Sequence, residues 1–316
     1  MKLRSLLAWG LAYSMGGLSL VSAQDAAAPA VATTPTMHGS IKIARIAGDV
    51  FAVDHASGLK TKLSLNSLVS DGQTVETGAD ASVVLAFSNG AVINVKENSQ
   101  LSVNEFLQNP FSAAFRLRDS IHEPSVSTTR LDLLRGEIIS QVKKLNRDAG
   151  SSFTVETPVG AAGIRGTAFL LSYHSDGGVA HFVLSMAEGL IRFLPLHGHP
   201  VEVPAGKEVS ASASIDVSGK VVSISEVSTP ESISPSNQAI LQQNVADVLG
   251  AAMNVEFSAS AANSTGGAPS TGGNATTPGT DPTASPSSNT DTPSDNPLAS
   301  PPAVPPAQRT TPGDGV

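Results

Sequence analysis

The sequence predicts an all-β domain of many short strands, arranged as a sandwich or as a rolled, solenoid-like sheet. Three observations support this class: apolar residues alternate with a period of two, Asn-Gly or Asp-Gly interrupts the alternating runs, and runs recur about every ten residues. Alternation places one side of each strand against a core. Because a core forms between sheets in either arrangement, the pattern does not choose between them.

Hairpins account for the clearest runs. Alternating apolar residues at 82–87 are followed by Asn89-Gly90 and then by a second apolar run at 92–95. This pattern predicts a hairpin with a type I′ turn, in which both central residues need positive φ. Asp176-Gly177-Gly178 separates two later runs in the same way. Further short strands are expected at 74–77, 169–173, 179–184, 189–193, 201–203, 208–213 and 220–224.

Two segments depart from the β pattern. Residues 106–128 have no clean period and contain Pro110 and Pro124, so we expect a long surface insertion of the kind that often carries function. Residues 236–253 place apolar side chains at helical spacing, with Ser236 as a candidate N-cap. A helix that packs against the sheet is the simpler interpretation, and a partner-binding helix is the alternative.

The N-terminus has the layout of a secretory signal peptide. Lys2 and Arg4 precede a mostly apolar stretch, and small residues end at Ala23, ahead of an expected cleavage site. An uncleaved membrane anchor is the alternative, but polar and glycine residues dilute the stretch, and a span needs ~20 apolar residues. No later window is apolar enough to cross a bilayer once the signal is removed.

Composition divides the chain into five expected parts. These are a signal peptide at 1–23, a flexible linker at 24–39, a β domain at 40–228, a helical segment at 229–257 and a tail at 258–316. The tail is rich in Ser, Thr, Pro and Gly and poor in large apolar side chains. Such a segment cannot bury enough surface to offset the entropy lost on ordering, so we expect it to be disordered.

Charge and cysteine content exclude several classes of protein. The chain has no cysteine, which rules out a disulfide scaffold, thiol chemistry and lipid attachment at an N-terminal cysteine. Its formal net charge is −8, and no dense Lys and Arg block is present. Because nucleic-acid binding depends on neutralising phosphates, no nucleic-acid partner is expected.

The sequence offers few candidates for catalysis or metal binding. Glu137, Glu156 and Glu188 could form the carboxylate pair of a glycosidase, although a solvated strand face explains each of them. His197 and His199 could begin a metal site, but the glycine between them and the proline after them favour an exposed turn. We therefore expect no catalytic residue, no cofactor and no metal.

The most informative segment is 153–169, which reads F-T-V-E-T-P-V-G-A-A-G-I-R-G-T-A-F. It predicts a strand, a Pro-Gly break and a new strand that opens at Gly166-Thr167. No Gly-Lys-Ser/Thr and no helix follow, so the glycines are expected to allow close backbone approach rather than to hold phosphate. Arg165 could bind an anion or pair with a carboxylate such as Glu156 or Glu188, and the ion pair is the simpler expectation.

Several motifs in a fixed order resemble the FecR domain, a non-catalytic extracytoplasmic module of bacteria. Gly48-Asp49-Val50 opens the resemblance, the 153–169 segment is its most recognisable part, and 204–207 closes it near residue 209. The residues expected to form its structural motif are Pro158, Gly160, Gly163, Arg165, Gly166, Thr167, Phe169, Gly189 and Gly206.

The resemblance implies an all-β fold and a place in the cell envelope. In the best-known FecR proteins the domain is the periplasmic part of a transmembrane regulator whose cytoplasmic head holds a sigma factor, and stand-alone exported FecR domains also exist. Only the signal-like segment and a short linker precede the domain here, so no such head is expected. We expect a periplasmic or secreted, non-enzymatic module that binds an envelope protein or polysaccharide. A periplasmic signalling component with a separate membrane partner and a carbohydrate-binding or carbohydrate-active protein are the alternatives.

Overall fold

The computed structural model describes residues 35, 37–65 and 67–259, which form twenty strands, one α-helix and two short 3-10 helices. This confirms the predicted all-β class with one C-terminal helix. The signal peptide expected at 1–23, most of the linker expected at 24–39 and nearly all of the expected tail lie outside these residues. No helix in this part of the chain has the length and apolar character needed to cross a membrane.

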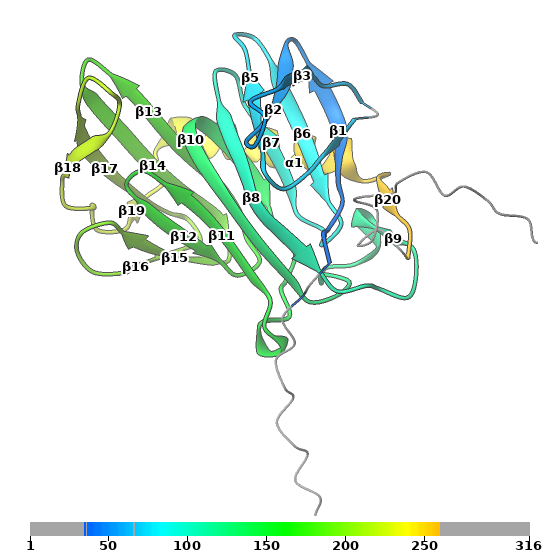
Figure 1. Cartoon of the computed structure of the whole chain (residues 1–316). Helices are drawn as coiled ribbons and strands as arrows, with labels where there is room; N and C mark the ends of the chain where they lie inside the picture. The colour runs from blue at the N-terminus through cyan, green and yellow to red at the C-terminus, as the bar shows by residue number, and fades with distance from the viewer. Residues whose placement is uncertain (1–34, 36, 66, 260–316) are drawn as a thin grey trace, which may run out of the picture. The chain divides into compact units, whose positions relative to one another are not determined.

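The strands form two layers that share the long strand β10 (Ser127–Gln141) (Figure 1). Sheet A contains, in spatial order, β3 (Lys60–Lys62), β2 (Val50–Asp54), β5 (Gln73–Thr77), β8 (Gln100–Gln108), the first part of β10, β11 (Ser152–Thr157), β12 (Gly160–Ile164), β15 (Leu190–Pro195) and β16 (Val201–Pro204). The β10–β11 pair is parallel, and the other pairs of sheet A are antiparallel.

Sheet B contains β4 (Leu68–Val69), β1 (Ile41–Ala47), β6 (Ser82–Phe87), β7 (Val92–Val95), the second part of β10, β13 (Ala168–Asp176), β14 (Val179–Glu188), β17 (Lys207–Ile215) and β18 (Val221–Ile224). The short strand β19 (Glu231–Ser232) pairs with the start of β17. β9 (Phe115–Arg116) and β20 (Glu256–Phe257) form a separate pair.

β10 passes from one layer to the other at Gly136. Up to Arg135 the strand pairs with β8 of sheet A, and from Gly136 onward it pairs with β13 of sheet B. Gly136 has a φ of 94°, and a Cβ there would lie 2.1 Å from Oγ of Ser99. That hydroxyl oxygen also accepts a hydrogen bond from the backbone N–H of Glu137, at 3.0 Å. The strand can cross between layers here because residue 136 has no side chain.

The main core lies between the two sheets. Apolar side chains from strands of both sheets form one buried cluster, which includes Leu131 and Phe193 of sheet A and Leu85 and Phe169 of sheet B. The rings of Phe182 in β14 and Phe193 in β15 stack across the layers with centroids 4.6 Å apart. Such a core uses only the inward residues of each strand, as the period of two predicts.

The hairpin predicted at Asn89-Gly90 is confirmed, but its predicted turn type is wrong. Gly90 has a φ of 90°, whereas Asn89 does not have positive φ. The N–H of Gly90 donates to the carbonyl of Phe87, and the N–H of Phe87 donates to the carbonyl of Ala91. This is a three-residue loop with glycine in the left-handed position, which needs only one positive φ.

The outer face of sheet B is covered by α1 (Pro235–Ala252), as the packed-helix interpretation predicted. Leu241 of the helix is buried against Ile139 and Leu170. The helix begins one residue before the predicted cap: Ser234 is the N-cap and Pro235 the first helical residue, where its missing N–H is not needed.

The expectation of a surface insertion at 106–128 is wrong for much of that segment. Its start continues β8, and its end begins β10. Between them, Phe111 and Phe115 are buried against sheet B, beside the C-terminal end of α1. Side chains on the outer face of β6 and β7 provide the apolar surface that draws the segment in, and they are buried as a result.

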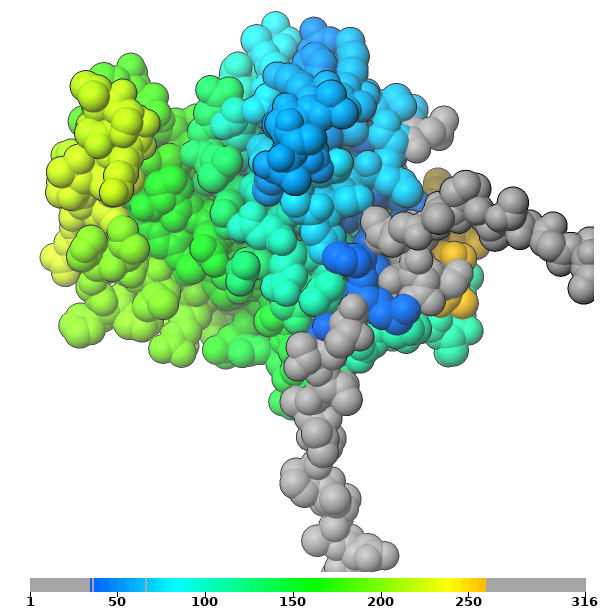
Figure 2. Space-filling view, in the orientation of Figure 1, coloured from blue at the N-terminus to red at the C-terminus, as the bar shows by residue number. Residues whose placement is uncertain are grey.

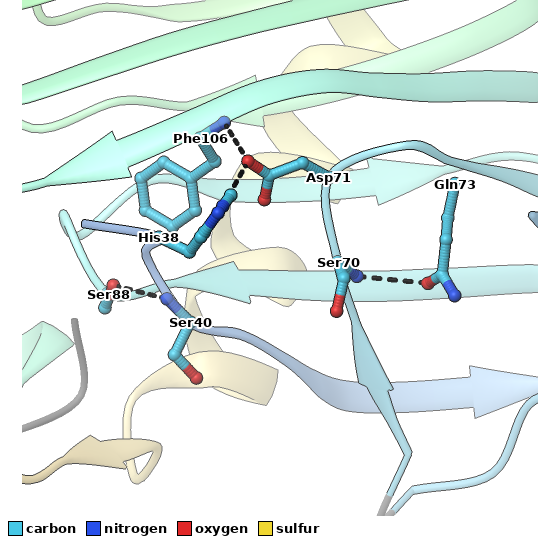
Figure 3. Close-up of polar contacts among 7 residues, drawn as sticks. All are labelled: His38, Ser40, Ser70, Asp71, Gln73, Ser88 and Phe106. Carbon is cyan, nitrogen blue, oxygen red and sulfur yellow. Dashed lines mark hydrogen bonds and ion pairs between the residues drawn. The ribbon is translucent and has the colours of Figure 1, made fainter. Parts of the chain in front are cut away.

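Polar contacts fasten the residues just before β1 to the domain (Figure 3). Nδ1 of His38 lies 2.8 Å from Oδ2 of Asp71, and the same oxygen accepts the backbone N–H of Phe106 at 3.2 Å. The N–H of Ser40 donates to Oγ of Ser88 at 3.0 Å. The folded domain therefore includes residues that precede its first strand.

Candidate functional site

Sheet A presents an exposed outer face. In β11, Phe153 and Val155 are buried, whereas Ser152 and Glu156 are exposed. This alternation is typical of a sheet covered on one side, and it contrasts with the continuous burial of β7 in sheet B. In Figure 1, β8, β10 and β11 lie in front of α1, and Figure 2 shows the same side in space-filling form, with residues from cyan to green at its centre.

Three glycines of the predicted motif lie where the chain passes between the sheets. Gly166 connects β12 to β13, Gly189 connects β14 to β15, and Gly206 connects β16 to β17. Their φ angles are 92°, 83° and 76°, in the left-handed region that favours glycine. The path of the backbone therefore favours glycine at each position.

Four other motif residues lie in or beside the strands that meet there. Pro158 lies in the turn between β11 and β12, and Phe169 is fully buried in the core. A Cβ on Gly160 would lie 2.5 Å from the carbonyl oxygen of Leu194, so β12 and β15 approach closely at that point. Thr167 exchanges two backbone hydrogen bonds with the residue after β10, of 2.8 and 3.1 Å, which fixes the start of β13.

Gly163 differs from the other glycines of the motif. It does not have positive φ, and a Cβ there would come no closer than 3.6 Å to its nearest neighbour, the carbonyl oxygen of Arg192. The expectation that this glycine allows close backbone approach is therefore wrong, because an alanine would fit. Its bare backbone instead leaves a hollow between Thr154 of β11 and Arg192 of β15, its two neighbours in the sheet.

That hollow is a cleft of about 480 Å³ on the outer face of sheet A. Gly163 and Ala161 of β12 form its floor. Thr154 lies on the β11 side, and Arg192 and Leu194 lie on the β15 side. The other lining residues are Arg147, Ser151, Ser152, Phe153, Ile164 and Arg165. Because β11 and β12 are antiparallel, the start of β11 and the end of β12, with Arg147 and Arg165, meet at one end of the cleft.

The cleft is positively charged. Three arginines and no Asp or Glu line it, and Arg147, Arg165 and Arg192 form no ion pair with any carboxylate of the described residues. Such a set of like charges is stabilised when an anion binds among them.

The expected ion pair of Arg165 with Glu156 or Glu188 is therefore wrong. Glu156 pairs in register with Ala161, toward the opposite end of β12, and Glu188 pairs with Ala168 in sheet B. The anion-binding alternative is the one that the geometry favours.

A second hollow of about 740 Å³ adjoins the cleft and shares Arg147 and Arg165 with it. It adds Lys144 and His122 to the positive or protonatable groups, with Asp148 as the one acidic residue of its lining. The two hollows together form a trough, which we call the arginine trough, with the shared arginines at its centre.

A buried carboxyl group fastens the loop that carries Lys144 and Arg147. Glu123 is 4% exposed; its Oε1 accepts the backbone N–H of Asn146 at 2.5 Å, and its Oε2 accepts the hydroxyl of Ser127 at 2.7 Å. Burial raises the pKa of Glu123, although these hydrogen bonds and one with Ser151 act in the opposite direction.

Comparison with known families identifies the domain. Residues 73–192 match the family model described as FecR protein, a segment that runs from β5 into β15 and includes Gly163, Arg165 and Arg192. Residues 73–192 form a FecR-like domain. No curated protein matches it.

Two crystal structures of a proposed anti-sigma factor from Parabacteroides distasonis ATCC 8503 are similar to this FecR-like protein. They share 11% and 10% sequence identity with it, at TM-scores of 0.33 and 0.34. Each match covers 50% of this chain and 60% of the other chain, so it spans less than two thirds of the anti-sigma factor.

The carboxylates considered for glycoside hydrolysis lie apart in the FecR-like domain. Glu156 is on the outer face of sheet A, Glu188 ends β14, and Glu137 lies in the sheet B part of β10, where burial raises its pKa. His197 and His199 are exposed in the turn between β15 and β16. Among the described residues, no three His, Asp or Glu side chains are grouped so as to hold a metal ion.

Sequence reasoning singled out Arg165 but missed Arg147, Arg192 and Glu123. An arginine at an outward strand position carries no signal of its own, since solvated strand faces commonly hold charged side chains. Arg147 lies in a loop between strands of different sheets. Its position beside Arg165 depends on the parallel pairing of β10 with β11, which no local pattern predicts.

Proposed function

We propose that this FecR-like protein is an exported, non-catalytic binding module of the bacterial cell envelope and that the outer face of sheet A contacts its partner. The signal-like start of the sequence supports export. The observation that carries the proposal is the unequal cover of the two sheets. The main contacts of α1 are with strands of sheet B and with β10, whereas the arginine trough lies on sheet A.

The chemistry of the trough supports binding rather than catalysis. Arginine stays protonated at physiological pH, so it holds anions by charge and by its fork of N–H donors and does not transfer protons. Ser151, Ser152 and Thr154 line the cleft, whereas the histidine and the carboxylate of the trough, His122 and Asp148, line the adjoining hollow and not the cleft.

A role in envelope signalling, with a separate membrane protein as the partner, is the second candidate. The FecR match over 73–192 favours it. In that case the face of sheet A would contact a protein, and the trough would hold an acidic surface of that protein.

A photocrosslinking amino acid tests which face makes the contact. It is placed at Arg130 on the outer face of β10 or at Gln243 on the exposed side of α1, in cells of the source bacterium. We expect adducts with an envelope component from residue 130 and none from residue 243, with the protein in the periplasmic or secreted fraction. Adducts from residue 243 alone would contradict the proposal, and so would recovery of the FecR-like protein itself in the cytoplasmic fraction.

A further inference from the structure

We propose that the arginine trough binds an acidic saccharide chain whose oxyanion groups (carboxylate, phosphate or sulfate) are held by Arg147, Arg165 and Arg192. This inference rests on the proposed function, because it names the class of ligand for the face that was assigned to partner binding. Three features of the site support it: its charge, its shape and its hydroxyl groups.

The charge of the site selects an oxyanion. The guanidinium group offers paired N–H donors that match the two oxygens of a carboxylate, phosphate or sulfate. Three such groups around one cleft, on a chain with a net charge of −8, are a local reversal of the overall charge. The nearest acidic neighbour of Arg192 across the sheet is Glu202, which forms no ion pair with it among the described residues.

The shape of the site fits an extended ligand rather than a single ion. The cleft of about 480 Å³ and a hollow of about 740 Å³ lie on either side of Arg165 and Arg147, which line both. Sites for drug-sized ligands have volumes of about 300–1,000 Å³, so the trough offers room for several linked rings. Gly163 keeps the floor open, since any side chain there would project into the space above β12.

The hydroxyl groups favour a saccharide over an acidic peptide. Ser152 and Thr154 line one side of the cleft and can exchange hydrogen bonds with sugar hydroxyls. A peptide commonly docks by adding backbone hydrogen bonds at a free strand edge. The floor strand β12 is paired on both sides, with β11 and with β15, so it offers no free edge to a peptide.

Isothermal titration calorimetry on the full chain tests the proposal. The probes are oligogalacturonate, which bears carboxylates, a sulfated dextran oligosaccharide, and a neutral dextran oligosaccharide of matched length. We expect at least one acidic oligosaccharide to bind, with an affinity that falls as salt rises, and the neutral one not to bind. No binding of either acidic oligosaccharide would overturn the proposal.

Matched variants locate the site. Arg165→Gln and Arg192→Gln should each weaken binding about tenfold or more, because each removes a charge-assisted hydrogen-bonding group. Gly163→Leu should block the cleft floor, with unchanged far-UV circular dichroism as evidence of folding. Arg45→Gln, which makes the same charge change on sheet B, should leave the affinity unchanged within about twofold. Equal losses in Arg45→Gln and Arg165→Gln would overturn the assignment of the site.

Two further probes separate the alternatives. Poly-glutamate that binds as tightly as the acidic oligosaccharides would overturn the saccharide in favour of an acidic protein. If inorganic phosphate binds as tightly as the acidic oligosaccharides, the site holds a single anion, and the saccharide proposal is overturned. Either result, combined with crosslinks from residue 130, would leave the proposed function standing. Absence of crosslinks from residue 130 would contradict the proposed function itself.

Discussion

Gly189 rests directly on Gly166. A Cβ on Gly189 would lie 2.6 Å from the carbonyl oxygen of Gly166 and 2.8 Å from Cγ2 of Thr167. The two glycines are far apart in the sequence, but each begins a passage between the sheets, and both passages meet at this point. The contact explains the glycine at 189, whereas glycine at 166 follows from its φ of 92° and from a Cβ that would lie 3.0 Å from Cα of Lys144.

A glycine series separates the costs of backbone conformation and of close contact. We expect Gly163→Ala to leave stability unchanged, because residue 163 has neither a positive φ nor a close neighbour at the position of the added Cβ. Gly206→Ala should lose roughly 1–2 kcal/mol, since its φ is positive but no atom lies within 4 Å of the added Cβ. Gly189→Ala meets both costs and should lose more than Gly206→Ala. Urea denaturation measures the three values, and equal losses at Gly189 and Gly163 would contradict this account.

Glu123 should make stability depend on pH in a direction that is unusual for a carboxylate. Burial raises its pKa in the folded state above the ordinary value of 4.5, so the folded protein binds more protons than the unfolded chain just above that pH. The free energy of unfolding contributed by this group therefore falls as pH rises from about 4.5 through the folded pKa.

The variant Glu123→Gln tests this dependence. The amide is neutral at every pH, and its oxygen can still accept the N–H of Asn146. We expect the variant to gain stability relative to the parent as pH rises from acidic to neutral in thermal denaturation. A difference that stays constant with pH would show that burial does not govern Glu123.

Leu241 should anchor α1 to sheet B. Its side chain is 2% exposed and is buried against Ile139 and Leu170. Leu241→Ala should lower the free energy of unfolding by about 2–5 kcal/mol, the range for truncating a buried leucine. Gln243→Ala, at an exposed position of the same helix, is the matched control and should change stability little. Equal effects of the two variants would argue that the helix does not pack on the sheet in solution.

Asn89 should stabilise the contact between the β6–β7 hairpin and β10. Its Nδ2 donates to the hydroxyls of Ser127 and Thr129, at 3.2 and 3.1 Å, and its Oδ1 accepts the N–H of Ala91 at 3.1 Å. Asn89→Ala removes these bonds and should cost about 1–3 kcal/mol in chemical denaturation, mainly at Thr129 and the N–H of Ala91, because the hydroxyl of Ser127 keeps its bond to Glu123. A neutral effect would mean that the hydroxyls find other partners.

Local sequence patterns predict the positions of the strands more accurately than they predict the tertiary contacts of the segments between them. The run before Asn89-Gly90 identified a strand and a hairpin, because alternation and glycine reflect local geometry. The predicted turn type is wrong, and the side chain of Asn89 hydrogen-bonds Ser127 and Thr129, which are distant in the sequence and are not part of the local pattern. The local pattern likewise predicts a surface loop for the segment with Phe111 and Phe115, because its burial depends on the outer face of sheet B.

The sequence by itself determined the all-β class, the C-terminal helix and the glycines that the backbone requires, such as Gly166 and Gly189. These follow from the period of side chains along a strand and from the φ angles that only glycine adopts readily. Only the tertiary structure decided that Arg147, Arg165 and Arg192 share one cleft and that Gly163 opens its floor. The pairing of β11, β12 and β15 brings these residues together across a sheet, and such pairing depends on contacts between residues distant in the chain.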